Sequence, residues 1–339
     1  MNPSFDAILI LSFGGPEGME EVMPFLENVL RGRNVPRERM QEVAHHYELF
    51  GGVSPINAQN RALIAALKKE LDERGPRLPI YWGNRNWHPL LADTVRQMAE
   101  DGIRRALCFA TSAYSSYSSC RQYLENIERA REGVGAGAPV IEKLRAFYNH
   151  PGFIEANAEH ARAGLEKIPV ERRPEAYLAF TAHSIPKAMA ENCDYEAQLL
   201  EASGLVAEAV GHEKWRLVFQ SRSGPPTQPW LEPDICDYLR ELKEAGARDV
   251  IVSPVGFISD HMEVLYDLDT EAQARAAELG INMVRAATAG THAAFISMIR
   301  ELILERMDSA ITPRFLGTRG IKSCGYPSDC CLPGQMRPA

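Results

Sequence analysis

Residues 176–186 have the sequence AYLAFTAHSIP, in which a short apolar run is followed by a histidine and then a proline. An apolar run of this length is typical of a buried β-strand. Proline is common in the first turn of a helix, so a helix is expected to begin after Pro186. A strand followed by a helix is the repeating unit of α/β folds, and the segment therefore predicts this fold class.

The same alternation of apolar runs and helical periodicity extends over most of the chain. The expected strands are 7–12, 78–83, 105–110, 140–146, 176–181, 215–220, 249–254 and 282–286. The expected helices are 58–73, 92–101, 122–131, 153–167, 194–210, 233–244, 264–279 and 292–308. Apolar strands that alternate with amphipathic helices predict parallel sheets covered by helices on both faces. We expect two halves of four strands each, although the sequence shows no internal repeat.

The chain has 339 residues, which is enough for two domains of ordinary size. We place the boundary near Asn149–Pro151, so that residues 1–149 form an N-terminal half and residues 150–310 a C-terminal half. Residues 311–339 contain proline, glycine, arginine and cysteine without periodicity, and we expect them to form a short C-terminal tail.

Composition limits the kinds of partner. The formal net charge is −8 and no cluster of lysine and arginine stands out, so nucleic acid is not expected as a partner. No apolar stretch approaches the roughly 18 residues of a transmembrane helix, and the N-terminus lacks the features of a secretory signal. We expect a cytoplasmic monomer, and peripheral contact with a membrane stays open.

His183 is the first candidate for chemistry. In open α/β sheets, ligands bind beyond the carboxyl ends of the strands, and His183 lies at such a position. Neutral imidazole can bind Fe²⁺ or accept a proton near neutral pH. A histidine that only hydrogen-bonds a loop carbonyl is the alternative, and this segment alone does not separate the two.

A row of three carboxylates is the second candidate. Glu263, Asp267 and Glu271 follow the strand 249–254 and are spaced by four residues, which places them on one face of a helix. Like charges at this spacing repel one another, but hard oxygen ligands in a row suit the passage of a divalent cation. A solvated acidic face is the alternative, and the position of Glu263 in the first helical turn beside a strand end favours function.

Further loops follow the other strands. SFGGP (12–16) has paired glycines but no phosphate-binding motif. The loop 111–123 is rich in tyrosine and hydroxyl groups, which suits carboxylates and a flat aromatic ligand. QSRSGPP (220–226) is another hydroxyl-rich loop, and no G-x-S-x-G motif of a serine hydrolase is present.

Together these segments resemble the ferrochelatase family. The resemblance covers the chain from Leu11 to about Glu305, and it is strongest to the actinobacterial branch of the family. The segments that carry it are SFGGPEG, YELFGGVSPIN, GNRNWHP, TSAYSSYSSCRQY, FTAHSIP, QSRSGPPTQPWLEPD and GFISDHMEVLYDLD. It implies the chelatase fold, in which two Rossmann-like half-domains enclose a porphyrin cleft.

The resemblance also implies roles for individual residues. His183 and Glu263 match the family's ligands of the substrate Fe²⁺, and Asp267 and Glu271 match its inner acidic row. Ser54 and Tyr123 match porphyrin contacts of the coproporphyrin-using branch, Arg31 or Arg33 would help to hold propionates, and Phe13 would contact the porphyrin. Phe13 replaces a tyrosine that can ligate iron axially in some relatives, which excludes an axial tyrosinate there.

Three of the seven cysteines, Cys324, Cys330 and Cys331, crowd the C-terminal tail. In a reducing compartment such clustering indicates metal ligation more than disulfides. The resemblance implies a 2Fe-2S cluster held by these three residues and Cys120, with Cys193 as the rival for the fourth position. Free thiols in a frayed tail are the alternative.

The expected function is insertion of Fe²⁺ into coproporphyrin III in haem biosynthesis, with other enzymes of that pathway as partners. His183 would take a pyrrole proton. The alternatives are a protoporphyrin IX ferrochelatase, a non-catalytic porphyrin- or haem-binding iron–sulfur protein, and a cobalt chelatase acting on sirohydrochlorin. Cobalt chelatases usually rely on paired histidines, and we expect a single histidine in the cleft. A periplasmic-type binding protein is disfavoured because no signal peptide is evident.

Overall fold

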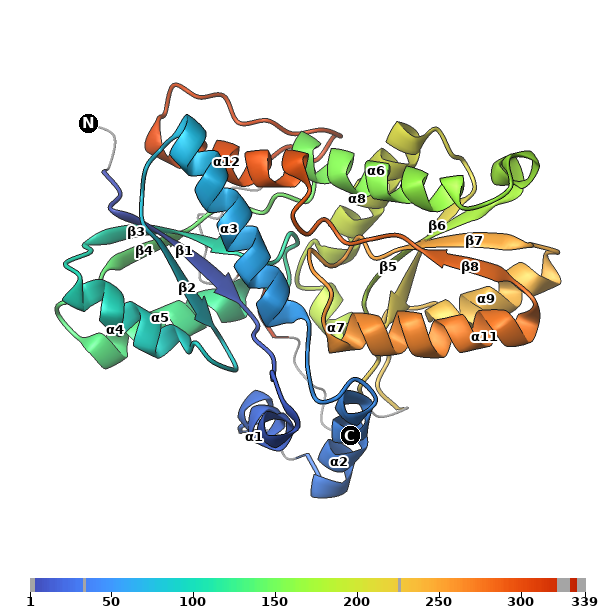
Figure 1. The fold of residues 1–339 in the computed structure, drawn as a ribbon, viewed down its shortest axis with the longest axis horizontal. Coiled ribbons are helices and arrows are strands. Elements are labelled where there is room, and N and C mark those ends of the chain that lie inside the picture. The colour runs from blue at the N-terminus through green and yellow to red at the C-terminus, as the bar shows by residue number, and fades with distance from the viewer. Residues whose placement is uncertain (1–3, 33–34, 225–226, 322–329, 334–339) are drawn as a thin grey trace.

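The computed structural model describes residues 4–32, 35–224, 227–321 and 330–333. It contains two separate four-stranded sheets in which every pair of neighbouring strands is parallel (Figure 1). The strands of the first sheet are β1 (Ala7–Ser12), β2 (Ile80–Asn84), β3 (Arg105–Ala110) and β4 (Val140–Lys143). Those of the second are β5 (Tyr177–His183), β6 (Trp215–Gln220), β7 (Asp249–Ser253) and β8 (Asn282–Arg285). The α/β class and the four-plus-four strand count predicted from the sequence are confirmed.

Both sheets have the same strand order. It is β2-β1-β3-β4 in the first and β6-β5-β7-β8 in the second, so the two halves share one topology although the sequence shows no repeat. In each sheet the chain moves from the first strand to one side and then crosses to the other side. The topological switch points, where ligands bind in such sheets, therefore lie between β1 and β3 and between β5 and β7.

The helices cover the faces of the sheets and join the two halves. They are α1 (Met19–Val29), α2 (Arg37–Glu48), α3 (Ile56–Arg74), α4 (Leu91–Glu100), α5 (Gln122–Val134), α6 (Pro151–Glu166), α7 (Lys187–Ala190), α8 (Tyr195–Val210), α9 (Ile235–Glu244), α10 (Met262–Val264), α11 (Gln273–Leu279) and α12 (Ala293–Met307). The last helix, α12, follows the second sheet but packs against α3 of the first half and α6 of the second (Figure 1).

One hydrophobic cluster extends across both halves. It includes Ile8 of β1 and Phe180 of β5, and within it the rings of Phe109, Phe147 and Phe295 pack on one another in stacked, edge-on and tilted pairs. The proposed boundary at residue 149 therefore separates two sheets that share an interior, and the division into domains stays a prediction.

Two helices of the first half were not predicted. Helix α1 contains Pro24, and its N-cap residue, Gly18, has no side chain to cap the helix; both features weaken a helical signal. Helix α2 is mainly polar and buries only Ala44 and Tyr47. The two helices pack on each other and project beyond the carboxyl ends of the strands (Figure 1).

Segment 311–321 of the tail lies at the junction of the halves. The side chain of Asn149 donates to the carbonyl of Gly320 at 2.9 Å, and Arg145 donates to the carbonyl of Arg314 at 2.8 Å. Further along, Arg121 of the first half donates to the carbonyl of Cys330 at 3.2 Å. All three contacts are made by residues of the first half, and the backbone N–H of Thr318 in the tail donates to Glu201 of α8 in the second half at 2.8 Å. The tail therefore contacts both halves.

Candidate functional site

The switch point of the second sheet brings the two principal candidates together. His183 is the last residue of β5, and Glu263 follows β7, the strand that pairs with β5. The predicted strand ended at Thr181, and the two extra residues pair with β6 up to Gln220. The sheet itself therefore fixes the backbone of His183. Its Nε2 lies 3.6 Å from Oε2 of Glu263.

Hydrogen bonding assigns the tautomer of His183. Its Nδ1 lies 2.5 Å from the carbonyl oxygen of Ser184, which can only accept, so Nδ1 carries the proton. In the neutral ring this leaves a lone pair on Nε2, the nitrogen that lies near the Glu263 carboxylate. A gap of 3.6 Å is too long for a hydrogen bond. Two ligand atoms each about 2.1 Å from one metal ion can be up to about 4.2 Å apart, so the gap has the width for a bridging cation.

A second histidine lies beside the pair, so the expectation of a single histidine is wrong. His261 Nδ1 is 3.9 Å from Glu263 Oε2, and its ring packs edge-on against Phe257 with centroids 4.9 Å apart. Burial lowers the pKa of His261, with the charge of Glu263 opposing that shift. The sequence signal was its position in DHME, two residues before Glu263.

The predicted acidic row lies on one continuous helical stretch. Residues Leu265–Ala272 form a π-helical segment between α10 and α11, a local widening that is frequent at functional sites. The pKa of Asp267 is raised to about 7, chiefly because the carboxyl is buried; the hydrogen bond from Ser221 opposes this rise, and the charges of Glu263 and Glu271 contribute to it. Burial also raises the pKa of Glu271, with Asp234 as the second cause. Asp267 is therefore within electrostatic reach of both Glu263 and Glu271.

Two side chains at the end of β6 hold Asp267. The hydroxyl of Ser221 and the amide of Gln220 both donate to Oδ2 of Asp267, the latter at 3.3 Å. The amide of Gln220 also lies 3.3 Å from the carbonyl oxygen of Glu263. The sequence analysis noted this loop for its hydroxyl groups but did not predict the contact.

Phe13, Tyr123 and Ser54, three candidates of the first half, lie around the other switch point. Phe13 follows β1 and is partly exposed, and Tyr123 lies in α5 beyond β3 and is buried. Arg85, at the end of β2, links them because its guanidinium lies 4.5 Å from the Tyr123 ring and 5.8 Å from the Phe13 ring. Ser54 is buried against Gly15, where an added Cβ would lie 2.7 Å from that of Ser54. Arg31 is exposed just after α1, and Arg33 lies outside the described residues.

Helices α1 and α2 connect the two switch points. Phe25 of α1 packs against the rings of Phe13, Tyr47 and Trp87, and Met262 beside Glu263 belongs to the same buried cluster. Burial raises the pKa of Tyr47, and the charge of Glu263 raises it further. The unpredicted helices therefore bring residues of the first half next to Glu263.

The predicted cluster cysteines are partly within the described structure. Cys120 is buried in a π-helical turn (Tyr117–Arg121), and Arg121 beside it holds the carbonyl of Cys330. The Sγ atoms of Cys330 and Cys331 are 3.3 Å apart, whereas Cys324 lies outside the described residues. In the part of the chain that the structure describes, no group of three or more His, Cys, Asp or Glu side chains is arranged to hold a metal ion.

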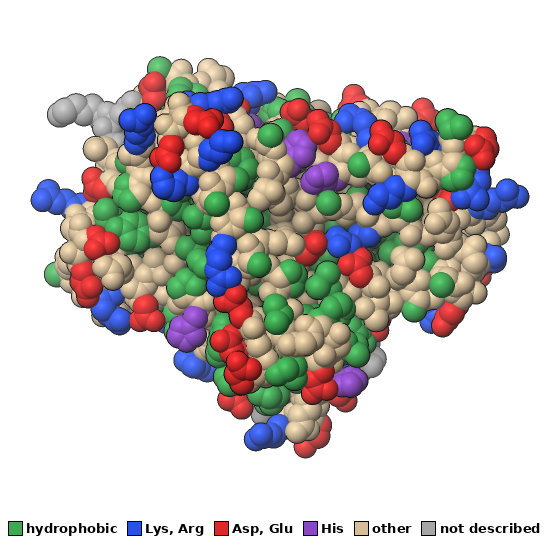
Figure 2. Space-filling view, in the orientation of Figure 1, with side chains coloured by type: hydrophobic (Ala, Val, Ile, Leu, Met, Phe, Trp, Pro, Cys, Tyr) green, Lys and Arg blue, Asp and Glu red, His purple; other side chains and the backbone are tan. Residues whose placement is uncertain are grey.

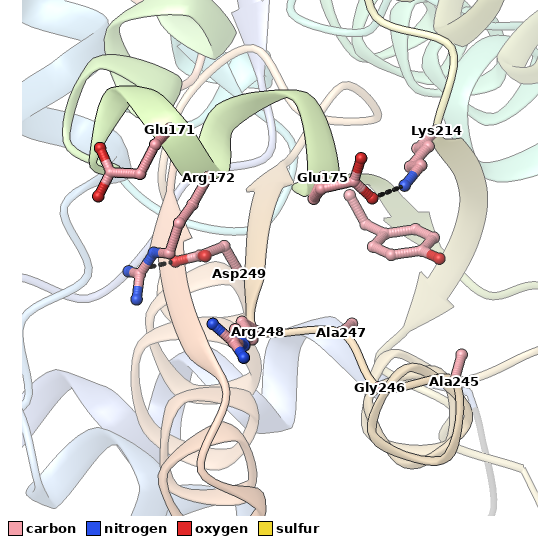
Figure 3. A pocket seen from close by; sticks show the side chains of 10 residues that line it. Glu171, Arg172, Glu175, Lys214, Ala245, Gly246, Ala247, Arg248 and Asp249 are labelled. Carbon is pink, nitrogen blue, oxygen red and sulfur yellow. Dashed lines mark hydrogen bonds and ion pairs between the residues drawn. The ribbon is translucent and has the colours of Figure 1, made fainter.

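A pocket of about 290 Å³ lies elsewhere, at the opposite edge of the second sheet (Figure 3). Its charges are largely paired within the pocket. Arg172 lies 2.9 Å from Asp249, and Lys214 pairs with Glu175. It contains none of the predicted site residues and lies where strands begin, so we do not assign the chemistry to it.

On the face seen in Figure 2, lysine and arginine side chains are interspersed with acidic ones. Among the described residues, no helix has both the length and the apolar character needed to cross a membrane.

The paired sheets and the His–Glu site at a switch point define a protein with the chelatase fold. Among solved structures, SirB from Bacillus subtilis with Fe3+ has a TM-score of 0.56 at 12% identity, covering 91% of this chain and 97% of SirB. The sirohydrochlorin chelatase SirB from Bacillus subtilis subspecies spizizenii in complex with cobalt has a TM-score of 0.51 at 11% identity, covering 90% and 96%. At such identities these likenesses show the fold alone.

The sequence comparisons identify the family. The family model described as Ferrochelatase matches residues 5–307. A ferrochelatase of Rhodopirellula baltica is 56% identical over 99% of this chain and 96% of its own length. A coproporphyrin III ferrochelatase of Nocardia farcinica is 54% identical over 98% of both chains. The chain belongs to the ferrochelatase family.

Proposed function

We propose that this protein inserts Fe²⁺ into coproporphyrin III to give the iron chelate, in haem biosynthesis. The observation that carries the proposal is the 3.6 Å separation between Nε2 of His183 and Oε2 of Glu263. Imidazole nitrogen and carboxylate oxygen are both suitable ligands for ferrous iron. The substrate comes from relatives such as the Nocardia farcinica protein, which is named for coproporphyrin III.

The reaction exchanges two pyrrole protons for one metal ion. His183 and Glu263 would hold the substrate Fe²⁺ on one face of the macrocycle. The Nε2 atom of His183 has a single lone pair, so it can serve the ion or a proton but not both at the same moment. Asp267, whose pKa of about 7 suits proton exchange near neutral pH, would provide a second acceptor, with Glu271 continuing the path outward.

The substrate propionates would be held at the switch point of the first sheet. Ser54 and Tyr123 are buried there and Phe13 is partly exposed, and Arg31, exposed just after α1, would add a cation. Binding energy from peripheral carboxylates can offset a distortion that exposes pyrrole nitrogens. A porphyrin with four propionates would gain more from such anchors than protoporphyrin IX, which has two.

A 2Fe-2S cluster held by Cys120, Cys324, Cys330 and Cys331 is also proposed. The hydrogen bond from Arg121 to Cys330 supports it, because it brings the cysteine-bearing tail beside Cys120. Four thiolates are the usual ligand set of such a cluster. When bound, the cluster would supply a covalent link between the tail and the first half. Iron and acid-labile sulfide analysis of the protein purified anaerobically, with visible absorption, tests this assignment.

The decisive experiment follows the visible spectrum during anaerobic incubation with Fe²⁺ and coproporphyrin III. Loss of the free-porphyrin bands and growth of metalloporphyrin bands is expected for the wild type. His183→Ala should bind the porphyrin but leave it metal-free, and turnover by this variant would overturn the assignment of His183. Parallel kinetics on protoporphyrin IX decide the porphyrin, because the Rhodopirellula baltica relative is named only ferrochelatase.

If the wild type binds porphyrin without metalating it, the non-catalytic carrier becomes the better description. The sirohydrochlorin alternative gains a second histidine from the structure, His261, so sirohydrochlorin with Co²⁺ belongs in the same assay. A cytoplasmic location, a monomeric state, peripheral membrane contact and contacts with other haem-pathway enzymes stay predictions.

A further inference from the structure

Ser221 has a backbone conformation that its residue type rarely adopts. Its φ is 63°, in the left-handed region that glycine occupies readily and other residues seldom do. Such conformations cost free energy and persist where the surrounding structure enforces them, often at functional sites. The strained residue follows directly after Gln220, the register partner of His183 in the second sheet.

In this left-handed conformation the hydroxyl of Ser221 donates a hydrogen bond to Oδ2 of Asp267, 46 positions away in the chain. Asp267 lies between Glu263 and Glu271 in the acidic row, and its charged form is disfavoured by burial. A carboxylate in such surroundings needs donors to stay in one orientation.

The same backbone connects Asp267 to the histidine. The carbonyl of Gln220 accepts from the backbone N–H of Ser184 at 2.8 Å, while its side chain lies 3.3 Å from both Asp267 Oδ2 and the carbonyl of Glu263. The end of β6 therefore contacts all three parts of the proposed metal path: the His183 segment, Glu263 and Asp267.

We propose that Ser221 is a positioning residue for metal delivery, whose hydroxyl, aimed by the left-handed backbone, holds the Asp267 carboxylate in line with Glu263 and His183. The inference rests on the proposed function. Ser221 acts through Asp267 and does not itself bind the metal or the porphyrin.

The test separates the hydroxyl from the backbone. Ser221→Gly removes the hydroxyl and accepts a φ of 63° without strain, so this variant should fold. Ser223→Gly is the matched control, because Ser223 is an exposed serine two residues along the same loop. Steady-state rates are measured anaerobically with Fe²⁺ varied at saturating coproporphyrin III, and then with the porphyrin varied. The thermal unfolding midpoint of each variant, compared with that of the wild type, shows whether the variant folds.

We expect Ser221→Gly to lower kcat/KM for Fe²⁺ about tenfold and to leave the KM for the porphyrin unchanged. Ser223→Gly should match the wild type. Ser221→Asn, which tolerates the left-handed backbone and offers an amide donor, should recover part of the loss.

A double-mutant cycle identifies the residue through which Ser221 acts. In an Asp267→Asn background, Ser221→Gly should cause little further loss, because the group that the hydroxyl positions is already altered. Full additivity of the two losses, or an unchanged kcat/KM for Fe²⁺ in Ser221→Gly, would overturn the inference. Failure of the wild type to metalate any porphyrin would instead overturn the proposed function, so the two failures are distinguishable.

Discussion

Replacing Asp267 by asparagine should make the protein more stable and less active. The amide keeps an oxygen that can accept from Ser221 and Gln220, so the hydrogen bonds to the side chain survive. What disappears is a carboxylate whose ionisation is disfavoured by burial and by the neighbouring charges of Glu263 and Glu271. Stability would be gained at the expense of function, as is common at active sites.

The direction of the stability change on replacing Asp267 follows from how its protonation depends on pH. The pKa of Asp267 is about 7 in the folded protein, against 3.8 as its ordinary value. Below about pH 4 the carboxyl is protonated in both states and has no effect on stability. As the pH rises from about 4 to 7 the unfolded chain releases the proton and the folded protein keeps it, so stability falls. Above about pH 7 the carboxyl is ionised in both states, and the folded protein bears the full free-energy cost of the buried charge.

The difference between the two pKa values corresponds to about 4 kcal/mol. The side chain of Asp267 is only partly buried by its accessible surface, so we halve this figure to about 2 kcal/mol at pH 8. A chain of this length has an unfolding entropy of about 0.7 kcal/mol/K, which converts the gain to about 3 °C in Tm at pH 8 and about 1 °C at pH 5.

Differential scanning calorimetry of the metal-free protein at the two pH values measures the effect. Asp269→Asn is the matched control, because Asp269 lies two residues along the same helical segment and pairs with Arg285 at 2.6 Å. Loss of that ion pair should lower Tm or leave it unchanged. A Tm gain for Asp267→Asn that is equal at pH 5 and pH 8, or a loss at pH 8, would refute the reasoning.

Three further predictions concern other parts of the site. Glu263→Gln should bind coproporphyrin III normally but lose about 100-fold or more in kcat/KM for Fe²⁺, since a charged ligand of the ion is removed; a loss confined to porphyrin binding would contradict its role. Cys120→Ser should reduce iron and sulfide content and the visible absorption of the purified protein, whereas the same change at Cys236 should not. Gly256→Ala should lower Tm by about 1–4 °C, because its Cβ would lie 2.6 Å from Cα and Cβ of Ala182 in β5, and an unchanged Tm would show that the strand can shift.

The sequence was sufficient to predict the sheets because buried parallel strands are short apolar runs. Strands β1, β3 and β6 have the predicted bounds. Strand β2 begins two residues later than predicted, after Pro79, which cannot donate to a neighbouring strand. Helices α1 and α2 escaped prediction because their stability depends on packing against each other and against Met262, which local periodicity does not report.

The proximity of His183 and Glu263 was predictable, because residues at the carboxyl ends of adjacent parallel strands lie close together. The positions of His261 and Ser221 were not. His261 belongs to the site because it packs against Phe257 and lies beside Glu263. Ser221 belongs to it because of a left-handed backbone conformation, which no sequence motif around a serine predicts. The π-helical segment was predicted only as part of an ordinary helix, since its wider hydrogen bonding leaves no mark in the hydrophobic pattern.

The hydrophobic cluster that runs through both sheets also affects how the molecule can be taken apart. Phe109 and Phe147 of the first half pack against Phe295 of α12, which follows the last strand of the second. A fragment that ends near residue 149 would expose these rings to water and should aggregate. The two halves should melt in a single cooperative transition, and a large hinge opening like that of two-lobed binding proteins would break this shared interior. A flat substrate would therefore have to enter and leave through the movement of smaller elements beyond the carboxyl ends of the strands. The pair α1 and α2 is the most prominent of these elements.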